Sequence, residues 1–155
     1  MSRLPSDPIA AGMDGRLWGN EAGRLDALLP SPCIQNHAAF LSLGKDGLAC
    51  LWFGGTLEGK SDISIYRSTL GPAGWSATNR ISDDSKRSEQ NPVEFHVPDG
   101  RQLVLHTAQL GGQQDACTVR MRELGGEPRD LPLPKGTFIR GPVHVRPDGA
   151  WLLPL

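Results

Sequence analysis

The stretch "NHAAFLSLGKDGLACLWFGG", residues 36–55, contains two largely apolar runs joined by a Lys-Asp-Gly turn at Asp46. Apolar runs on both sides of an Asp-Gly pair indicate a β-hairpin. The pattern recurs in "NPVEFHVPDGRQLVLHTAQ" (91–109) and "GPVHVRPDGAWLLPL" (141–155). The turn aspartates Asp46, Asp99 and Asp148 are spaced 53 and 49 residues apart. A period near 50 that contains several strands is typical of the blades of a β-propeller.

The first repeat unit can be completed from its sequence. Strands are expected at Ala38–Leu43 and Leu48–Phe53, then at "ISIYRSTL" (63–70) and "GWSATNRIS" (74–82). The second unit repeats this order, with "ACTVRMREL" (116–124) as its third strand and a weak fourth strand around "EPRDLPL" (127–133). We therefore predict an all-β fold with about two to three four-stranded blades of a β-propeller.

The predicted blades occupy residues 32–155, and residues 1–31 form an N-terminal segment. Within that segment "NEAGRLDALL" (20–29) is compatible with a short helical turn or with an outer strand that closes a blade. Because a closed propeller needs roughly four to eight blades, we expect the chain to be the N-terminal part of a longer ring. The alternative is that partner chains complete the ring.

Composition excludes several functional classes. The formal net charge of −1 gives no excess of positive charge that would attract nucleic acid or anionic lipid. The sequence has no run of 18 apolar residues, so no membrane-spanning segment is expected. The first residues lack the apolar core of a signal peptide. Three cysteines without a CxxC pair fit reduced thiols in a cytoplasm, and the histidines show no metal-ligand spacing. We expect a cytoplasmic protein without a metal or a cofactor.

The polar start of the first strand raises a question, because a strand about to be buried begins with Gln35, Asn36 and His37. In a propeller the first strand of each blade lines the central channel. The start of that strand and the loop between the second and third strands lie at one end of the channel, and the Asp-Gly turns lie at the other. We therefore expect these side chains at the channel mouth. Counted back from each turn aspartate, their counterparts are Gln90 and Asn91 in the second unit and Arg140 in the third.

The loops at the same end are also polar, and they add Glu58, Asp62, Gln114 and Asp115 to the expected mouth. The remaining charges of the loop "ISDDSKRSEQN" (81–91), including Glu89, are expected to be mostly solvated. Carboxylates, amides, an imidazole and a guanidinium around one hollow suit a hydroxyl-rich, anionic ligand. Arg140 offers the fork for a carboxylate, and His37 supplies histidine, the side-chain type whose ordinary pKa lies nearest to neutrality.

The segments "QNHAAFLSLGKDGLACLWFGGTLEGKSDISIYRS", "SEQNPVEFHVPDGRQLVLHTAQ" and "GTFIRGPV" resemble the BNR-repeat, sialidase-like superfamily, and in particular proteins labelled exo-alpha-sialidase. The resemblance runs from about Pro32 to Leu155 and implies a six- or seven-bladed ring. Where sialidases have an Arg-Ile-Pro motif, this chain has "QNHAAF". The histidine-bearing version resembles propeller polysaccharide lyases, which would make His37 the proton-transferring residue and Arg140 the group that neutralises a uronate carboxylate.

We accordingly expect a carbohydrate-active propeller that cleaves a glycosidic bond at an acidic sugar, as a sialidase-like glycosidase or a uronate-directed lyase. The expected catalytic residues are His37 and Arg140. The expected substrate-binding residues are Gln35, Asn36, Glu58, Asp62, Gln90, Asn91, Gln114 and Asp115. The alternatives are a non-catalytic glycan-binding propeller or an inactive fragment. The expected partner is a glycan, and exposed blade edges predict self-association.

Overall fold

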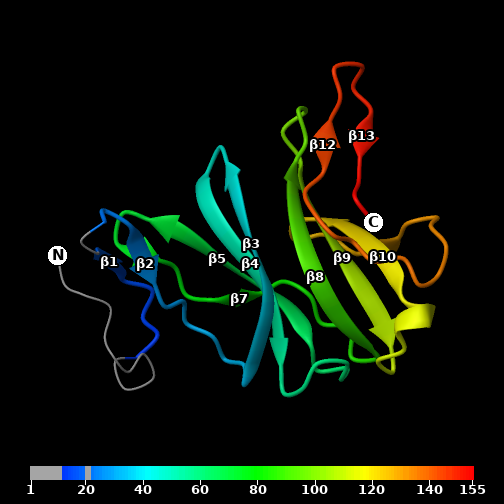
Figure 1. Cartoon of the computed structure of the whole chain (residues 1–155), viewed down its shortest axis with the longest axis horizontal. Coiled ribbons are helices and arrows are strands. Elements are labelled where there is room, and N and C mark those ends of the chain that lie inside the picture. The colour runs from blue at the N-terminus through cyan, green and yellow to red at the C-terminus, as the bar shows by residue number, and fades with distance from the viewer. Residues whose placement is uncertain (1–11, 20–21) are drawn as a thin grey trace.

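Figure 1 shows the computed structural model of the chain, which describes residues 12–19 and 22–155. The first blade is an antiparallel sheet in the order β3-β4-β5-β6, and β7 also pairs with β5. Its strands are β3 (Gln35–Gly44), β4 (Gly47–Gly55), β5 (Ser64–Gly71), β6 (Gly74–Trp75) and β7 (Asn79–Arg80). The long expected fourth strand at 74–82 is therefore split into two short strands that pair with different parts of β5.

The second blade is a four-stranded antiparallel sheet in the order β8-β9-β10-β11. Its strands are β8 (Arg87–His96), β9 (Gln102–Leu110), β10 (Thr118–Glu123) and β11 (Arg129–Asp130), with the short 3₁₀ helix η1 (Gln114–Ala116) before β10. The expected weak fourth strand is present, because β11 covers two residues of the range 127–133. A third hairpin, β12 (His144–Val145) and β13 (Trp151–Leu152), packs beside β8 (Figure 1).

The three Asp-Gly turns lie at the same end of the structure, at the top of Figure 1. The first two join β3 to β4 and β8 to β9, and the third joins β12 to β13. Two complete antiparallel sheets and a third hairpin, related by a repeat of about 50 residues, form part of a β-propeller. The predicted all-β propeller fold is confirmed.

The N-terminal segment forms a separate small hairpin from β1 (Leu17–Gly19) and β2 (Leu25–Ala27). The segment is tied to the first blade by the backbone N–H of Trp75, which donates to the carbonyl of Gly15 at 3.0 Å, and by Leu29, which packs against Cys50, Trp52 and Tyr66. A Cβ at Gly15 would lie 2.9 Å from Trp75, and the φ of Gly15 is 74°, so only glycine allows this approach. The described residues of the range 20–29 form a turn and β2, so the helical turn considered there is wrong.

Equivalent bulges bend the innermost strands of the two blades. The register shifts between His37 and Phe40 in β3, and between Gln90 and Val93 in β8. The residue after each first position has a positive φ, 49° for Ala38 and 52° for Asn91. These residues lie 53 apart, as the first two turn aspartates do. A bulge increases the local bend of its strand, so each innermost strand changes direction just after its polar start.

The apolar core lies between the blades. One buried cluster contains Leu51, Phe53 and Ile65 of the first blade together with Val104 of the second. A second cluster joins the second blade to the third hairpin, where Phe95 meets Trp151 edge to face at a centroid distance of 4.8 Å. The blades are thus held face to face by their side chains, and this packing fixes their inner strands side by side. Among the described residues no helix is long and apolar enough to cross a membrane.

Candidate functional site

The starts of the three inner strands meet around one hollow of about 210 Å³. Each strand contributes three consecutive residues: 38–40 from the first blade, 91–93 from the second and 139–141 before the third hairpin. Ala38, Asn91 and Arg140 occupy equivalent positions, each eight residues before its turn aspartate. The blade repeat therefore brings Asn91 and Arg140 to a common mouth, although they are 49 residues apart.

Arg140 is exposed at this mouth. Its guanidinium carbon lies 5.2 Å from the centre of the Phe138 ring, and its backbone N–H donates to the carbonyl of Pro154 at 3.0 Å. The backbone hydrogen bond fixes the main chain at Arg140, and the Phe138 ring packs against the guanidinium, whose N–H groups remain available to a ligand as far as the described residues extend.

His37 lines a second hollow of about 410 Å³, which shares Ala38 and Ala39 with the first. The exposed imidazole stacks on the buried ring of Phe53, with 5.3 Å between the ring centres. The rest of this hollow is lined by Met13, Leu29, Ser31, Asn36, Cys50 and Trp52. His37 and Arg140 therefore lie in adjoining hollows that share Ala38 and Ala39 in their lining.

Two of the other polar residues at the start of β3 support the site from within the protein. The Oδ1 atom of Asn36 accepts hydrogen bonds from Trp52 Nε1 at 3.0 Å and from Ser31 Oγ at 2.6 Å. The Oε1 atom of Gln35 accepts a hydrogen bond from the backbone N–H of Glu58 at 3.0 Å. The side-chain oxygens of both amides thus have protein partners, and Asn36 is exposed and lines the hollow beside His37.

Gln90 is buried, with 3% of its surface exposed, so this expected binding residue does not reach the mouth surface. Its Nε2 donates to Ser88 Oγ at 2.9 Å, and its Oε1 accepts from Gln109 Nε2 at 2.8 Å. The pairing of β8 with β9 places these amides in the sheet interior, where each needs a protein partner.

The polar loops meet at the same end as the mouth. Gly59 and Gly112 are in contact across the two blades, and a shallow hollow of about 560 Å³ between their loops includes Glu58. Asp62 is exposed, and its Oδ2 accepts a hydrogen bond from the backbone N–H of Thr56 at 3.0 Å. This hydrogen bond holds the pKa of Asp62 below its usual range. Gln114 and Asp115 are exposed on η1 and contribute to none of the three hollows.

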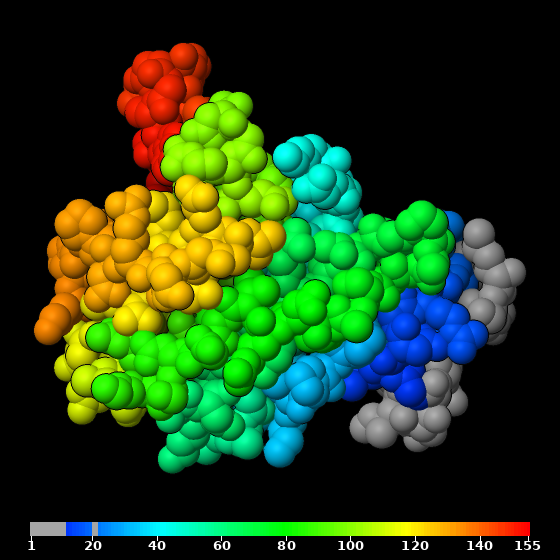
Figure 2. All heavy atoms as spheres, turned by 180° about the vertical axis from the view of Figure 1, so that it is seen from behind, coloured from blue at the N-terminus to red at the C-terminus, as the bar shows by residue number. Residues whose placement is uncertain are grey.

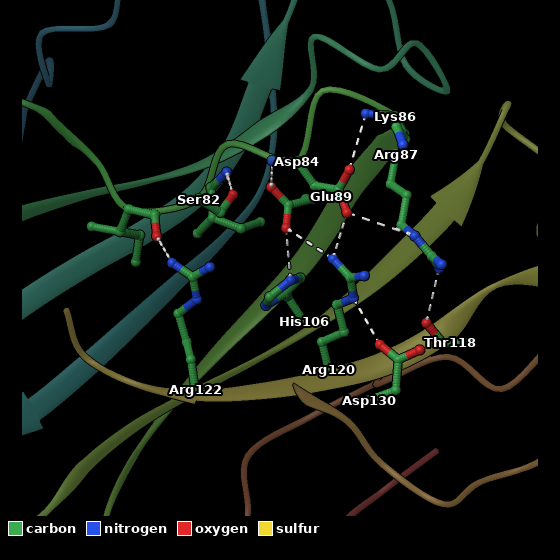
Figure 3. Close-up of polar contacts among 12 residues, drawn as sticks. Ser82, Asp84, Lys86, Arg87, Glu89, His106, Thr118, Arg120, Arg122 and Asp130 are labelled. Carbon is green, nitrogen blue, oxygen red and sulfur yellow. Dashed lines mark hydrogen bonds and ion pairs between the residues drawn. The ribbon is translucent and has the colours of Figure 1, made fainter. Parts of the chain in front are cut away.

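The structure also contains a buried ionic cluster that the sequence interpretation missed (Figure 3). Glu89 is fully buried rather than solvated, and its carboxylate lies 3.0 Å from Nε2 of the equally buried His106. Arg120 bridges Asp84 at 2.7 Å and Asp130 at 2.8 Å, and it lies 4.0 Å from Glu89. Burial alone would raise the pKa of Glu89, but the hydrogen bond and charge of His106 outweigh it and lower that pKa.

One sequence signal pointed to this cluster. Glu89 lies in the strand β8, which continues with the buried residues Val93 and Phe95. His106 follows the buried residue Leu105 in the apolar strand β9. A carboxylate and an imidazole within two adjacent buried strands require each other as partners. Within the described residues, no group of three or more His, Cys, Asp or Glu side chains is arranged to hold a metal ion.

The family model for the BNR repeat-like domain matches residues 46–155. The chain belongs to the BNR repeat-like family. Among solved structures, a GH43 β-1,3-galactosidase determined with galactodeoxynojirimycin is similar to it at 17% identity and a TM-score of 0.39. That similarity covers 76% of this chain and 36% of the galactosidase chain, so this chain spans well under half of that protein. Comparison with the curated proteins finds no match.

Membership of the BNR repeat-like family confirms the resemblance seen in the sequence. The matched region contains all three Asp-Gly turns and Arg140, whereas the β3 start with His37 lies before it. Tyr66, the only tyrosine of the chain, is buried in β5 and stacks near Trp52. Burial, followed by a hydrogen bond with Cys33, raises the pKa of Tyr66 to about 12. This BNR repeat-like domain therefore presents His37 and Arg140, not Tyr66, to its surface.

Proposed function

We propose that this BNR repeat-like domain is part of a carbohydrate-active propeller that binds an acidic sugar at the channel mouth. The observation that carries the proposal is the pair of adjoining hollows, one holding the exposed guanidinium of Arg140 and the other the exposed imidazole of His37. A guanidinium binds a carboxylate through two parallel hydrogen bonds, and Asn91 on the neighbouring strand adds an amide for a hydroxyl group.

The chemistry that these two side chains favour is β-elimination next to a uronate. In this reaction Arg140 neutralises the carboxylate, which makes the C5 proton easier to remove, and His37 accepts that proton. The bond between C4 and the leaving oxygen then breaks, C4 and C5 become doubly bonded, and the leaving oxygen takes up a proton. Hydrolysis by the usual route uses two carboxylates, and neither hollow has one among its described lining residues.

Product analysis tests this reaction. The protein is incubated with uronate-containing glycans and, separately, with sialylated glycans. Elimination gives a conjugated product that absorbs in the near ultraviolet, whereas hydrolysis does not. We expect the absorbing product, its loss in His37→Ala, and a strong decrease in Arg140→Lys, which keeps the charge but loses the planar fork.

Gln114→Ala is a matched control, because Gln114 is an exposed amide that lines neither hollow. Release of free sialic acid without an absorbing product would instead support a sialidase-like glycosidase. Binding of an acidic glycan without any product would support a non-catalytic role.

A further inference from the structure

The loops of the first two blades border a hollow of about 560 Å³ at the mouth end, which we call the lysine hollow. Its lining residues are Leu57, Glu58, Gly59, Lys60, Ser61, Lys86, Gly111 and Gly112. They come from the loops 56–63, 81–86 and 111–113, and neither the N-terminal segment nor the third hairpin contributes. Figure 2 shows the loops 56–63 and 111–113 side by side at the lower edge of the molecule. The lysine hollow is therefore a feature of the junction between two fully described blades.

Backbone contacts fix the loop that carries Lys60. A Cβ at Gly112 would lie 2.9 Å from the carbonyl oxygen of Gly59, and the φ of Gly112 is 74°, so only glycine allows the two loops to approach this closely. The backbone N–H of Lys60 donates to the carbonyl of Leu57 at 3.1 Å, and the backbone N–H of Ile63 donates to the carbonyl of Lys60 at 3.2 Å. The main chain on both sides of Lys60 is thus held at the border of the hollow.

The buried ionic cluster holds the loop that carries Lys86. The Oδ1 atom of Asp84 accepts a hydrogen bond from the backbone N–H of Lys86 at 3.0 Å, and its Oδ2 atom pairs with Arg120 at 2.7 Å (Figure 3). The backbone N–H of Asp84 donates to the buried carboxylate of Glu89 at 3.1 Å. The cluster, which the proposed reaction does not use, therefore fixes the backbone of Lys86 at the edge of the hollow.

The lysine side chains give the hollow an excess of positive charge. Within the described part of the chain, neither Lys60 nor Lys86 forms an ion pair, and both are exposed. The carboxylate of Asp62, in the same loop as Lys60, accepts the backbone N–H of Thr56 at 3.0 Å instead. Among the described lining residues Glu58 is the one carboxylate, so the two ammonium groups outnumber it. Ammonium groups without a protein partner suit an anionic group of a ligand.

Both blades connect the lysine hollow to the proposed sugar site. Lys86 directly precedes β8, and Asn91, which lines the hollow at the mouth, follows five residues later. At about 3.3 Å per strand residue, the two positions are roughly 17 Å apart. On the first blade, the backbone N–H of Glu58 donates to Gln35 at 3.0 Å, two residues before His37. A chain of several sugars can therefore reach both sites, whereas a single sugar cannot.

We propose that the lysine hollow binds a second carboxylate of the same glycan, several sugars along the chain from the carboxylate held by Arg140. This inference rests on the proposed function, and it narrows the ligand from an acidic sugar to a chain of repeated uronates. The two sites divide the recognition between them. The planar fork of Arg140 fixes one carboxylate in a single geometry, whereas an ammonium group accepts an anion from several directions and suits a distant carboxylate of a flexible chain.

The test is calorimetric titration with a galacturonate disaccharide and a galacturonate octasaccharide. Lys60→Gln with Lys86→Gln should weaken binding of the octasaccharide by roughly threefold to tenfold, because exposed ion pairs contribute modestly, and should leave binding of the disaccharide unchanged. Lys60→Arg with Lys86→Arg keeps both charges and should bind like the wild type. The matched control is Lys45→Gln with Lys135→Gln, which removes two exposed lysines outside the hollow and should leave both affinities unchanged. Far-ultraviolet circular dichroism checks the folding of every variant.

Arg140→Leu separates the second site from the proposed function. This variant should lose affinity for both oligosaccharides, since both need the first site. Full affinity in Arg140→Leu, or a wild type that binds neither oligosaccharide, would overturn the proposed function and the second site with it. When binding depends on Arg140, two results overturn the second site alone. One is an octasaccharide affinity that is unchanged in the glutamine variant or equally lowered in the control. The other is an equal loss for the disaccharide and the octasaccharide.

Discussion

Replacement of Glu89 by alanine is expected to cause a large loss of stability. The carboxylate of Glu89 is fully buried, and it accepts hydrogen bonds from His106 Nε2 at 3.0 Å and from the backbone N–H of Asp84 at 3.1 Å. Alanine leaves both groups without their acceptor inside the protein. Each buried group left without its hydrogen-bond partner costs about 1–3 kcal/mol, so the loss for the two groups is about 2–5 kcal/mol. At about 2–4 °C per kcal/mol, the melting temperature should fall by roughly 10 °C.

The assay is urea denaturation followed by circular dichroism, at a protein concentration where sedimentation shows a single chain mass. Glu127→Ala is the matched control, because Glu127 is an exposed glutamate of the same blade and should change the unfolding free energy by less than about 0.5 kcal/mol. A double-mutant cycle with His106→Ala should show strong coupling between the two positions. A loss below about 1 kcal/mol for Glu89→Ala would contradict this expectation, since it would mean that water or another acceptor replaces the carboxylate.

Three further predictions follow from particular contacts. The pKa of Glu89 is lower in the folded protein than its ordinary value of 4.5, so the stability that Glu89 contributes is complete above that value and is lost as the pH falls through the lowered pKa. When stability is measured against pH, Glu89→Gln should therefore lose stability less steeply than the wild type below about pH 4.5. Equal slopes would argue against this role of Glu89. A Cβ at Gly44 would overlap the His96 ring, so Gly44→Ala should destabilise the fold by about 1–3 kcal/mol. Adding the same change to a His96→Ala protein should cost much less, as two denaturation curves can show. Because Trp52 Nε1 donates to Asn36, Trp52→Phe should cost about 1–2 kcal/mol, and an unchanged unfolding midpoint would show that this hydrogen bond is dispensable.

The repeat made most of the fold predictable from the sequence. Asp46, Asp99 and Asp148 mark hairpins because an Asp-Gly turn constrains the backbone locally, and the 50-residue period follows from the length of one blade. The secondary structure of residues 74–82 was less predictable. Whether they form one strand or two depends on contacts with Gly15 and with different ends of β5, and local propensity does not record such contacts.

The candidate site was predictable in position more than in detail. Asn91 and Arg140 have equal offsets from their turn aspartates and line one hollow, since the offset measures distance along equivalent strands. The offsets do not reveal which polar residues are already satisfied. The side-chain oxygen of Gln90 accepts a hydrogen bond from Gln109, a residue that the pairing of β8 with β9 brings near. Glu89 was misjudged for the same reason, because its partner His106 is 17 residues away in the sequence.

Arg140 is the residue through which the mouth of the inner strands is proposed to bind an acidic sugar. The most direct test is calorimetric titration with a uronate oligosaccharide and with the same oligosaccharide after its carboxylates have been reduced to alcohols. We expect binding of the acidic form only, a loss of affinity of at least tenfold in Arg140→Leu, and nearly unchanged affinity in His37→Ala, since the guanidinium contributes charge-assisted hydrogen bonds of about 1.5–3 kcal/mol. Equal binding of the acidic and reduced forms, or full affinity in Arg140→Leu, would contradict the account.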